Sequence, residues 1–417
     1  MDKLVIHGGR SLNGVVQISG AKNAVLPIMA STIIVPGTYR IRRVPDLRDT
    51  RTMIRLLEII GCTVQFEKEG LVIDSTACNN PEAPYELVKT MRASFYVLGP
   101  LLSRFGYAKV SMPGGCAWGP RPINFHVDAM EKIGAETELV DGYIVAKGER
   151  LSGGRLEFEV SSVGATGNAI MAAVGAVGDT IICNAAMEPE ITCLCDFLNS
   201  MGARISGIGT SELRIGCGST MNAADVDVIP DRIEAATFLI AGAMSGGSVS
   251  VDSIIPEHLS SVLAMLELTG NKIDIGDTRV TITKRGRPKP VSIETGIYPG
   301  FPTDVQAQWM ALMSIADGES TITDTIYHDR FTHIAELNRL GSDIKLRQNG
   351  ATVKGKDHLR GAPVMSTDIR ASASLILAGL AAEGRTDISR VYHIDRGYQE
   401  VEKKFESLGA DIKRVRE

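Results

Sequence analysis

The stretch IRLLEIIGCTVQF, residues 54–66, decides the fold because it recurs five more times along the 417-residue chain. Each copy is an amphipathic segment that ends in glycine and continues into alternating polar and apolar residues, which predicts a helix, a glycine cap and a strand. The other copies are AMEKIGAETEL (129–139), FLNSMGARISG (197–207), MLELTGNKIDI (265–275), ELNRLGSDIKL (336–346) and KFESLGADIKR (404–414). The regular spacing of their glycines predicts six units of about 70 residues each.

A second, more apolar helix is expected before each amphipathic one. It is predicted to end at a glycine before a strand, at Gly37, Gly106, Gly178, Gly247, Gly318 and Gly384. Segments such as AATFLIAGAM and ASASLILAGLAA are apolar on nearly every side, which indicates burial all round. The strands alternate, as in residues 279–283, so each sheet should keep one face in water. The sequence therefore predicts an α/β fold with buried helices and solvent-facing sheets, the reverse of a TIM barrel.

The two ends of the chain predict how the six units group. The sixth unit stops after the single strand ADIKRV, whereas most units close with two strands, and the first strand, residues 3–7, has no unit of its own. If that strand completes the sixth unit, the chain crosses twice between two domains. We therefore expect a three-unit domain over residues 22–228 and a second over 1–21 plus 229–417, with a cleft that can close.

Composition and charge exclude several classes of protein. Hydrophobic residues make up 44% of the chain and charged residues 22%, which fits an ordinary globular protein. The net charge of −5 provides no overall basic field for nucleic acid or an anionic membrane. The N-terminus begins no signal peptide, and the longest helix-like apolar stretch, residues 371–382, is too short to cross a bilayer. The seven cysteines show no CxxC or zinc spacing, so we expect a reducing, cytoplasmic location.

Charged residues are predicted at the start of the buried helices. Counting back 14 or 15 residues from each glycine that ends an apolar helix reaches, in chain order, Lys22, Arg92, Gly164, Arg232, Asp304 and Arg370. A cation at a helix N-terminus opposes the helix dipole at a cost of a few tenths to about 1 kcal/mol unless an anion offsets it. Any single arginine can simply pair with a neighbouring acid, but the set favours a site for an anionic ligand. Further basic residues stand in loops at Arg121, Arg330 and Arg396.

Two residues, Asp304 and Cys116, are candidate catalytic residues. Asp304 can be the N-cap of the helix that follows it, or a base for a substrate hydroxyl among the surrounding cations. Cys116 lies in PGGCAWGPRP, a loop that cannot form regular structure, where Arg121 would favour the thiolate; the thiol can equally be incidental. The chain contains no Walker A loop, GxGxxG, HExxH or GxSxG, so ATP hydrolysis, hydride transfer and zinc or serine hydrolysis lose support.

Several long motifs follow one another along the chain: SGAKNAVLP, KTMRAS, PGGCAWGPRP, SVGAT, NAAMEPEI, PDRIEAATF, FPTDVQAQ, RFTHIAEL, TDIRASASL and HIDRGY. In these motifs the chain resembles the enolpyruvyltransferase family, and most closely its members that use a UDP-sugar. The resemblance implies two inside-out, barrel-like α/β domains, each of three βαβαββ units. It also implies transfer of the enolpyruvyl group of phosphoenolpyruvate to the 3′-hydroxyl of UDP-N-acetylglucosamine with release of phosphate, the first committed step of peptidoglycan synthesis. These two small molecules are the expected partners, and no metal or organic cofactor is implied.

The same resemblance assigns roles to individual residues. Lys22 and Asn23 are similar to phosphoenolpyruvate ligands, with Arg121, Arg370 and Arg396 completing a clamp on phosphate and carboxylate. Cys116 resembles the cysteine that donates a proton to the enol methylene carbon and can form a covalent adduct, and Asp304 the residue that takes the hydroxyl proton. We expect Lys22 and Arg396 to act in catalysis with them. Contacts to the substrates, chiefly the UDP-sugar, are expected from Arg92, Arg121, Pro122, Ile123, Asn124, Phe125, Ser162, Val163, Arg232, Ile326 and Arg330.

The chain also departs from the family pattern. Val160 stands where some members have a lysine near the nucleotide, Asn124 replaces an aspartate, and Trp118 replaces a small aliphatic residue. Two other functions remain open. One is a 5-enolpyruvylshikimate-3-phosphate synthase-like transferase, against which the cysteine loop counts. The other is a catalytically silent scaffold, which would be expected to lose the charged residues that this chain retains.

Overall fold

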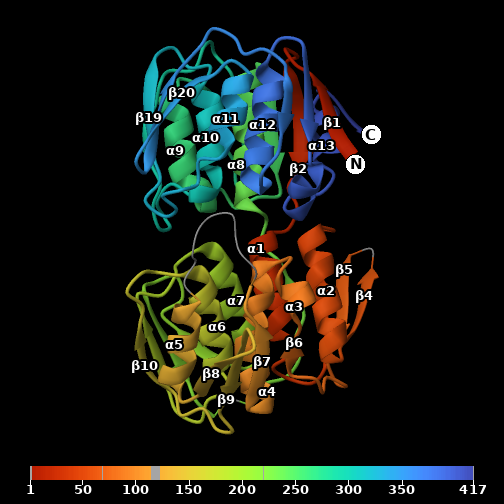
Figure 1. Ribbon diagram of the computed structural model, residues 1–417, viewed down its shortest axis with the longest axis vertical. Helices are drawn as coiled ribbons and strands as arrows, with labels where there is room; N and C mark the ends of the chain where they lie inside the picture. The colour runs from red at the N-terminus through yellow and green to blue at the C-terminus, as the bar shows by residue number, and fades with distance from the viewer. Residues whose placement is uncertain (1, 68, 114–122, 219, 417) are drawn as a thin grey trace. The chain divides into compact units, whose positions relative to one another are not determined.

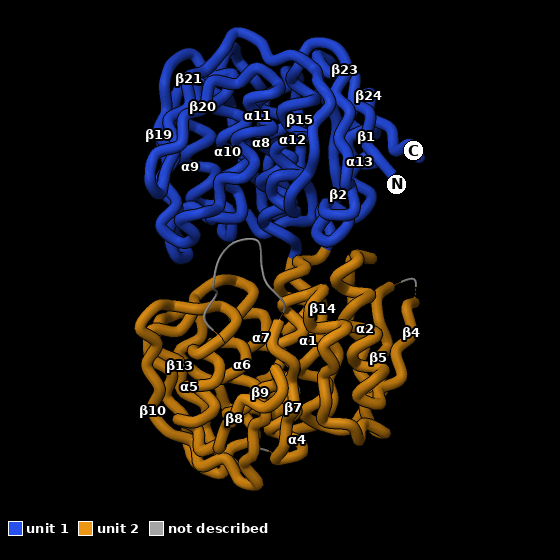
Figure 2. The backbone as a smooth tube through the Cα atoms, in the orientation of Figure 1, with its two compact units in different colours: residues 1–19, 230–417 blue, residues 20–229 orange. Residues whose placement is uncertain are grey.

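The computed structural model describes residues 2–67, 69–113, 123–218 and 220–416. The chain forms two compact units, which Figure 2 colours separately: residues 1–19 with 230–417, and residues 20–229. The chain therefore passes from one unit to the other after Ser19 and again after Ile229, close to the expected domain boundaries at residues 21–22 and 228–229.

The unit of residues 20–229 contains three four-stranded sheets. Their strand orders are β14-β3-β5-β4, β6-β7-β9-β8 and β10-β11-β13-β12. The strands are β3 (Thr38–Arg42), β4 (Thr63–Glu67), β5 (Gly70–Asp74), β6 (Glu82–Ala83), β7 (Tyr107–Ser111), β8 (Glu136–Val140), β9 (Tyr143–Lys147), β10 (Gly154–Glu157), β11 (Thr180–Cys183), β12 (Arg204–Ser206), β13 (Glu212–Gly216) and β14 (Val226–Asp227). The helices are α1 (Lys22–Ser31), α2 (Arg48–Ile60), α3 (Tyr85–Val88), η1 (Arg92–Val97), α4 (Leu98–Phe105), α5 (Asn124–Ile133), α6 (Val163–Ala173) and α7 (Pro189–Ser200).

The other unit repeats this plan with three more sheets. Their orders are β16-β17-β15-β2, β18-β19-β21-β20 and β22-β23-β1-β24. The strands are β1 (Asp2–His7), β2 (Leu12–Gln17), β15 (Gly247–Asp252), β16 (Lys272–Ile275), β17 (Arg279–Thr283), β18 (Ile293–Glu294), β19 (Glu319–Thr323), β20 (Asp343–Arg347), β21 (Gly350–Lys354), β22 (Pro363–Met365), β23 (Arg385–Ser389) and β24 (Asp411–Arg416). The helices are α8 (Arg232–Ser245), η2 (Pro256–Leu259), α9 (Ser260–Leu268), η3 (Thr303–Val305), α10 (Gln306–Met313), α11 (His333–Arg339), α12 (Ile369–Ala381), η4 (Val391–Arg396) and α13 (Val401–Ser407).

All six sheets share one pattern, in which a parallel edge strand joins three antiparallel ones. The parallel pairs are β14–β3, β6–β7, β10–β11, β2–β15, β18–β19 and β22–β23. Strand β1 lies between β23 and β24, with Leu4 paired to both Ile388 and Arg414. The first strand of the chain therefore completes the last sheet.

The apolar helices form the core of each unit, as the sequence predicts. Residues Ile233–Met244 of α8 and Arg370–Leu380 of α12 are buried, and Figure 1 shows α8, α10 and α12 side by side inside their unit. Strands keep one wet face; in β17, Val280 and Ile282 are fully buried while Arg279 is exposed. The predicted arrangement of helices inside and sheets outside is confirmed.

Glycine ends the amphipathic helices as expected. Gly61 and Gly134 are the left-handed C-caps of α2 and α5, with φ of 104° and 107°, a conformation that favours glycine. Three of the apolar helices end five or six residues earlier than predicted: α1 at Ser31, α6 at Ala173 and α10 at Met313, rather than at Gly37, Gly178 and Gly318. After α1 the chain tightens into three-residue turns and reaches Pro36, which cannot continue a helix.

Candidate active site

The residues predicted at the helix starts lie there in the structure. Lys22, Arg92 and Arg232 are the first residues of α1, η1 and α8, and Arg370 is the second residue of α12. Asp304 lies in η3, the single 3₁₀ turn that leads into α10. Gly164 is the second residue of α6. The periodicity of the sequence therefore located the same point of the repeat in all six units.

Asp304 is held between two arginines. Its Oδ1 accepts from Arg330 Nη1 and its Oδ2 from Arg370 Nη2, each at 2.7 Å. The side chain of Asp304 is 25% exposed and those of Arg330 and Arg370 only 11% and 8%, so the two cations depend on this carboxylate. The structure thus brings together three residues that the sequence could only nominate separately.

The two arginines set the charge state of Asp304. Burial alone would raise the pKa of this carboxyl, but the charges and hydrogen bonds of Arg370 and Arg330 outweigh burial and hold the pKa well below its usual range. Asp304 is therefore a carboxylate at neutral pH. The N-cap alternative is wrong, because the cap positions of η3 and α10 are occupied by Pro302 and Val305, and neither helix start has a side-chain cap hydrogen bond.

Buried polar side chains support Arg370 from behind. Arg370 Nη1 lies 3.5 Å from the Tyr398 hydroxyl, which shares a 2.8 Å hydrogen bond with Thr237. Gln308 Nε2 donates to Thr237 at 3.2 Å and to the Asp304 carbonyl at 3.0 Å. Sequence reasoning did not single out these residues, although Tyr398, Thr237 and Gln308 stand inside three of the quoted motifs.

Asp324 organises the loop that carries Ile326. Its fully buried carboxylate accepts from the Ile326 backbone N–H at 2.9 Å and from Thr303 Oγ1 at 2.7 Å. Because Thr303 precedes Asp304 and also accepts from Arg330, this network links the Ile326 loop to the carboxylate. Asp324 carried no sequence signal, because an acid that follows a strand is common.

Arg232 and Arg396 also lie in this unit. The Arg232 guanidinium stands 5.5 Å from the centre of the Tyr298 ring, and Asp231 caps α8 by accepting from the Ile233 and Glu234 N–H groups. Arg396 is the last residue of η4 and is partly exposed.

In the unit of residues 20–229, Lys22 pairs with an acid. Its Nζ lies 3.3 Å from Asp49 Oδ2 in the first turn of α2, and both side chains are nearly buried. Asn23, the next residue, is half-buried. The pair places one positive and one negative group at the start of the buried helix α1.

A histidine explains why Gly164 carries no side chain. A Cβ on Gly164 would lie 3.2 Å from both Cε1 and Nε2 of His126, so the imidazole already fills that space. The Nδ2 atom of Asn168 lies 2.8 Å from His126 Nδ1, and the rings of Phe95 and His126 pack edge to face with their centres 5.1 Å apart. Burial and the nearby charge of Arg92 lower the pKa of His126 to about 3, so the ring is neutral.

The other predicted contacts of this unit lie around the same helix starts. Ser162 caps α6 by accepting from the Ala165 N–H at 3.4 Å, and Val163 follows it. Ile123 and Asn124 form the start of α5, with Asn124 exposed. Phe125 packs edge-on against Phe158 at 6.5 Å. Residues Cys116, Trp118, Arg121 and Pro122 lie outside the described residues. Val160, at the position where some family members have a lysine, is 57% exposed.

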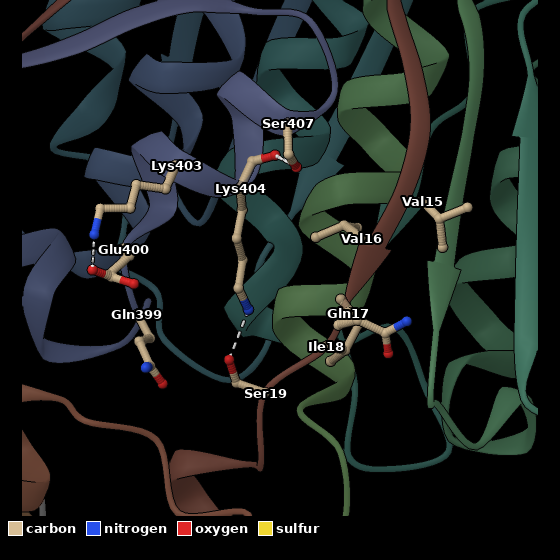
Figure 3. Close-up of a pocket in the computed structure, with 10 residues that line it drawn as sticks. All are labelled: Val15, Val16, Gln17, Ile18, Ser19, Gln399, Glu400, Lys403, Lys404 and Ser407. Carbon is tan, nitrogen blue, oxygen red and sulfur yellow. Dashed lines mark hydrogen bonds and ion pairs between the residues drawn. The ribbon is translucent and has the colours of Figure 1, made fainter. Parts of the chain in front are cut away.

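A surface pocket of about 500 Å³ lies elsewhere, against β2 and α13 (Figure 3). Lys404, on its wall, donates to Ser19 Oγ and to the buried Glu234, both at 2.7 Å. The pocket contains none of the predicted site residues, because residues of β2, of α13 and of the segments next to them line it, and the starts of the buried helices do not.

Among the described residues, the helices are too short or too polar to span a membrane.

Comparisons with known proteins identify the family. A family model described as EPSP synthase (3-phosphoshikimate 1-carboxyvinyltransferase) matches residues 6–405. UDP-N-acetylglucosamine 1-carboxyvinyltransferase from Chlorobaculum parvum is 55% identical, covering 99% of this chain and 98% of the relative. The enzyme of the same name from Geobacter metallireducens is 52% identical, with 100% of both chains covered.

Solved structures confirm the predicted fold. The enolpyruvyl transferase NikO from Streptomyces tendae matches with a TM-score of 0.90 and 27% identity over 99% of both chains. An EPSP synthase from Acinetobacter baumannii matches with a TM-score of 0.77 over 100% of both chains, and at 17% identity it supports the fold alone. On the full-length sequence identity and the shared fold, the chain belongs to the enolpyruvyl transferase family.

Proposed function

We propose that this protein transfers the enolpyruvyl group of phosphoenolpyruvate to the 3′-hydroxyl of UDP-N-acetylglucosamine and releases phosphate, which commits the sugar to peptidoglycan synthesis. The observation that carries the proposal is the 55% identity, over nearly the whole chain, to a relative named UDP-N-acetylglucosamine 1-carboxyvinyltransferase. The charged helix starts described above provide residues suited to both substrates.

The basic residues suit the anionic donor. Phosphoenolpyruvate carries a carboxylate and a phosphate, and planar guanidinium groups bind such oxyanions with paired hydrogen bonds. We assign this role to Lys22, Arg121, Arg370 and Arg396, with Asn23 beside Lys22. We assign Arg330, which pairs with Asp304, and Arg232 to the same donor-binding set. Arg92, residues 121–125, Ser162, Val163 and Ile326 are assigned to the UDP-sugar.

The addition of the sugar to phosphoenolpyruvate needs two proton transfers, which we assign to Cys116 and Asp304. The Cys116 thiol gives its proton to the methylene carbon of phosphoenolpyruvate while the sugar oxygen bonds to the adjacent carbon. Asp304 takes the proton from the sugar hydroxyl. The bond to phosphate then breaks, and loss of a proton from the new methyl group re-forms the carbon–carbon double bond, which gives the enol ether of the sugar. Because its pKa is low, Asp304 acts through position, accepting the proton as the new bond forms.

The test measures phosphate release from phosphoenolpyruvate with two acceptors side by side, UDP-N-acetylglucosamine and shikimate 3-phosphate. We expect release with the UDP-sugar alone. Equal release with shikimate 3-phosphate would assign the chain to the other branch of its family, and no release with either would support a silent paralogue. Both outcomes contradict the proposal.

The matched variant is Cys116→Ala, with Cys195→Ala as a control for removal of a thiol buried in α7. Cys116→Ala should lose phosphate release yet still bind UDP-N-acetylglucosamine in a calorimetric titration. Full turnover by Cys116→Ala would remove the cysteine from the mechanism.

A further inference from the structure

Two buried cysteines outside the proposed active site lie against each other. The Sγ atoms of Cys62 and Cys78 are 2.6 Å apart, closer than the roughly 3.5–4.0 Å at which non-bonded heavy atoms normally pack. Cys62 stands between the end of α2 and the start of β4, and Cys78 lies in the loop after β5. Both side chains are nearly inaccessible, at 5% and 6% exposure. Sequence reasoning gave this pair no role.

Backbone hydrogen bonds hold the two segments in register. The N–H groups of Asn79 and Asn80 both donate to the Ile60 carbonyl, at 3.1 and 3.2 Å, which ties the Cys78 loop to the last turn of α2. Gly61 permits the close approach, because a Cβ there would lie 3.2 Å from the Cα of Cys78. The thiols therefore meet because of fixed backbone geometry and not through the swing of a flexible side chain.

Arg104 also holds the loop that contains Cys78, through hydrogen bonds to backbone carbonyls. Its guanidinium donates to the carbonyls of Ile33, Ser75 and Cys78, at 3.0, 2.9 and 3.3 Å. The charge of this arginine is thus placed beside the thiol pair, where it favours a thiolate. A thiolate with a second thiol in contact is the arrangement from which disulfides form.

The two thiols differ in acidity. The hydrogen bond shared with the Cys62 thiol lowers the pKa of Cys78 more than burial raises it, and Arg104 lowers it further. The same contact, together with burial, raises the pKa of Cys62. Because Arg104 also donates to the carbonyl of Cys78 itself, we assign Cys78 as the nucleophile of the pair and Cys62 as the thiol that attacks second.

We propose that Cys62 and Cys78 form a reversible disulfide when the protein meets hydrogen peroxide. The Cys78 thiolate attacks one peroxide oxygen, the O–O bond breaks, and hydroxide leaves as Cys78 becomes a sulfenic acid. Cys62 then attacks that sulfur, the S–S bond forms, and the sulfenic oxygen leaves as water. In total, two thiols and one hydrogen peroxide give one disulfide and two waters. Cellular thiols reverse the step by exchange.

The disulfide would fasten the end of α2 to the loop after β5. It closes the chain segment between residues 62 and 78, which restricts the unfolded chain and should raise the midpoint of thermal unfolding. Helix α2 also carries Asp49, the partner of Lys22, in its first turn. The proposal does not depend on the reaction assigned above, and its test uses no substrate.

The experiment treats the reduced full-length protein with hydrogen peroxide, alkylates it in denaturant and digests it with trypsin. Cleavage after Lys68 separates the two cysteines, so a disulfide joins the peptide of residues 56–68 to that of residues 69–89. The joined peptide should weigh two hydrogen atoms less than the sum of the two, and should disappear after dithiothreitol. Alkylation of both Cys62 and Cys78 at a peroxide dose that oxidises Cys217, or a link to another cysteine, would overturn the proposal.

Single variants test the order of events. In Cys62→Ala the sulfenic acid on Cys78 should persist and be trapped by dimedone, whereas Cys78→Ala should give no trapped Cys62. Cys195→Ala, which removes another buried thiol, should still form the 62–78 link. Equal trapping on Cys62 and Cys78 in the two single variants would contradict the assignment of Cys78 as nucleophile. The thermal midpoint, measured before and after oxidation, should rise in the parent chain and stay constant in both pair variants.

Discussion

At the scale of single residues, Asp304 balances the charges of two arginines, Arg330 and Arg370. One carboxylate serves two nearly buried guanidinium groups, and both contacts are short. An isolated aspartate among arginines would be read from sequence as a cap or a base. The structure removes the first option and shows why the second requires positioning, because its partners keep this carboxyl ionised.

We predict that Asp304→Asn lowers phosphate release by about 10²–10⁴-fold, the usual contribution of a positioned proton acceptor. The amide also leaves two arginines without their charge partner, so the free energy of unfolding should fall by roughly 1.5–3 kcal/mol. Steady-state rates and urea unfolding measure the two effects. Asp317→Asn, at an exposed acid, is the control and should change neither. Wild-type turnover by Asp304→Asn would exclude it as the acceptor.

His126 gives a pH dependence whose sign can be stated. The folded protein holds the imidazole neutral with a pKa of about 3, whereas the unfolded chain binds a proton near pH 6.5. The stability of the folded state is therefore complete above pH 6.5 and falls as the pH drops from 6.5 toward 3, by up to about 1.4 kcal/mol per pH unit from this group.

His126→Gln should remove that part of the slope. Urea unfolding at several pH values between 7 and 5 measures it. A residual slope is expected, because burial also lowers the pKa of His333, to about 4. An unchanged slope in His126→Gln would mean that the ring is already protonated in the folded protein.

Single residues were predicted unevenly from sequence. The cations at helix starts could be found because they break the apolar pattern of a buried helix at a regular interval. Tyr398, Asp324 and His126 could not, because each acts through a buried hydrogen bond or contact to a residue distant in sequence. No local pattern encodes such a contact.

At the scale of elements, caps fix the helix starts that present the charged residues. Asp368 accepts from the N–H groups of Arg370 and Ala371, at 2.7 and 3.1 Å, and so sets the first turn of α12. The Arg370 side chain reaches Asp304 from that turn. The position of Arg370, a proposed substrate ligand, therefore depends on a cap two residues before it.

We predict that Asp368→Ala lowers stability by about 1 kcal/mol and raises the KM for phosphoenolpyruvate, because the first turn of α12 frays. Asp368→Asn keeps a side-chain oxygen at the cap and should stay close to wild type in both measurements. If the alanine and asparagine variants were impaired equally, the charge of Asp368 would matter and not its cap.

Helix α6 supplies a second prediction at this scale. Gly164→Ala places a methyl group 3.2 Å from the His126 ring, which Asn168 and Phe95 hold in place. The start of α6 must then shift by a few tenths of an ångström, so we expect weaker binding of UDP-N-acetylglucosamine in calorimetry. Gly276→Ala, whose nearest contact is an ordinary 3.4 Å, is the control and should bind normally. Unchanged affinity in Gly164→Ala would separate this helix start from the sugar site.

At the scale of the whole molecule, the repeat predicted the architecture because each unit needs the same buried helix and the same capped amphipathic helix. The periodicity gave six units and the layering, and the missing second strand of the last unit pointed to β1 as its partner. The two-residue edge strands β6, β14 and β18 were not predictable, since they are too short to show alternation. Their pairing is set by the strand beside them.

The identity of the product tests the proposed reaction most directly. Phosphoenolpyruvate labelled with ¹³C at its three carbons, incubated with UDP-N-acetylglucosamine and the full-length protein, can be followed by NMR. We predict that the label appears in an enol ether attached to the 3′-oxygen of the sugar, with one phosphate released for each ether formed. Label that remains in phosphoenolpyruvate, or that moves only to shikimate 3-phosphate when that acceptor is supplied instead, would contradict the proposed reaction.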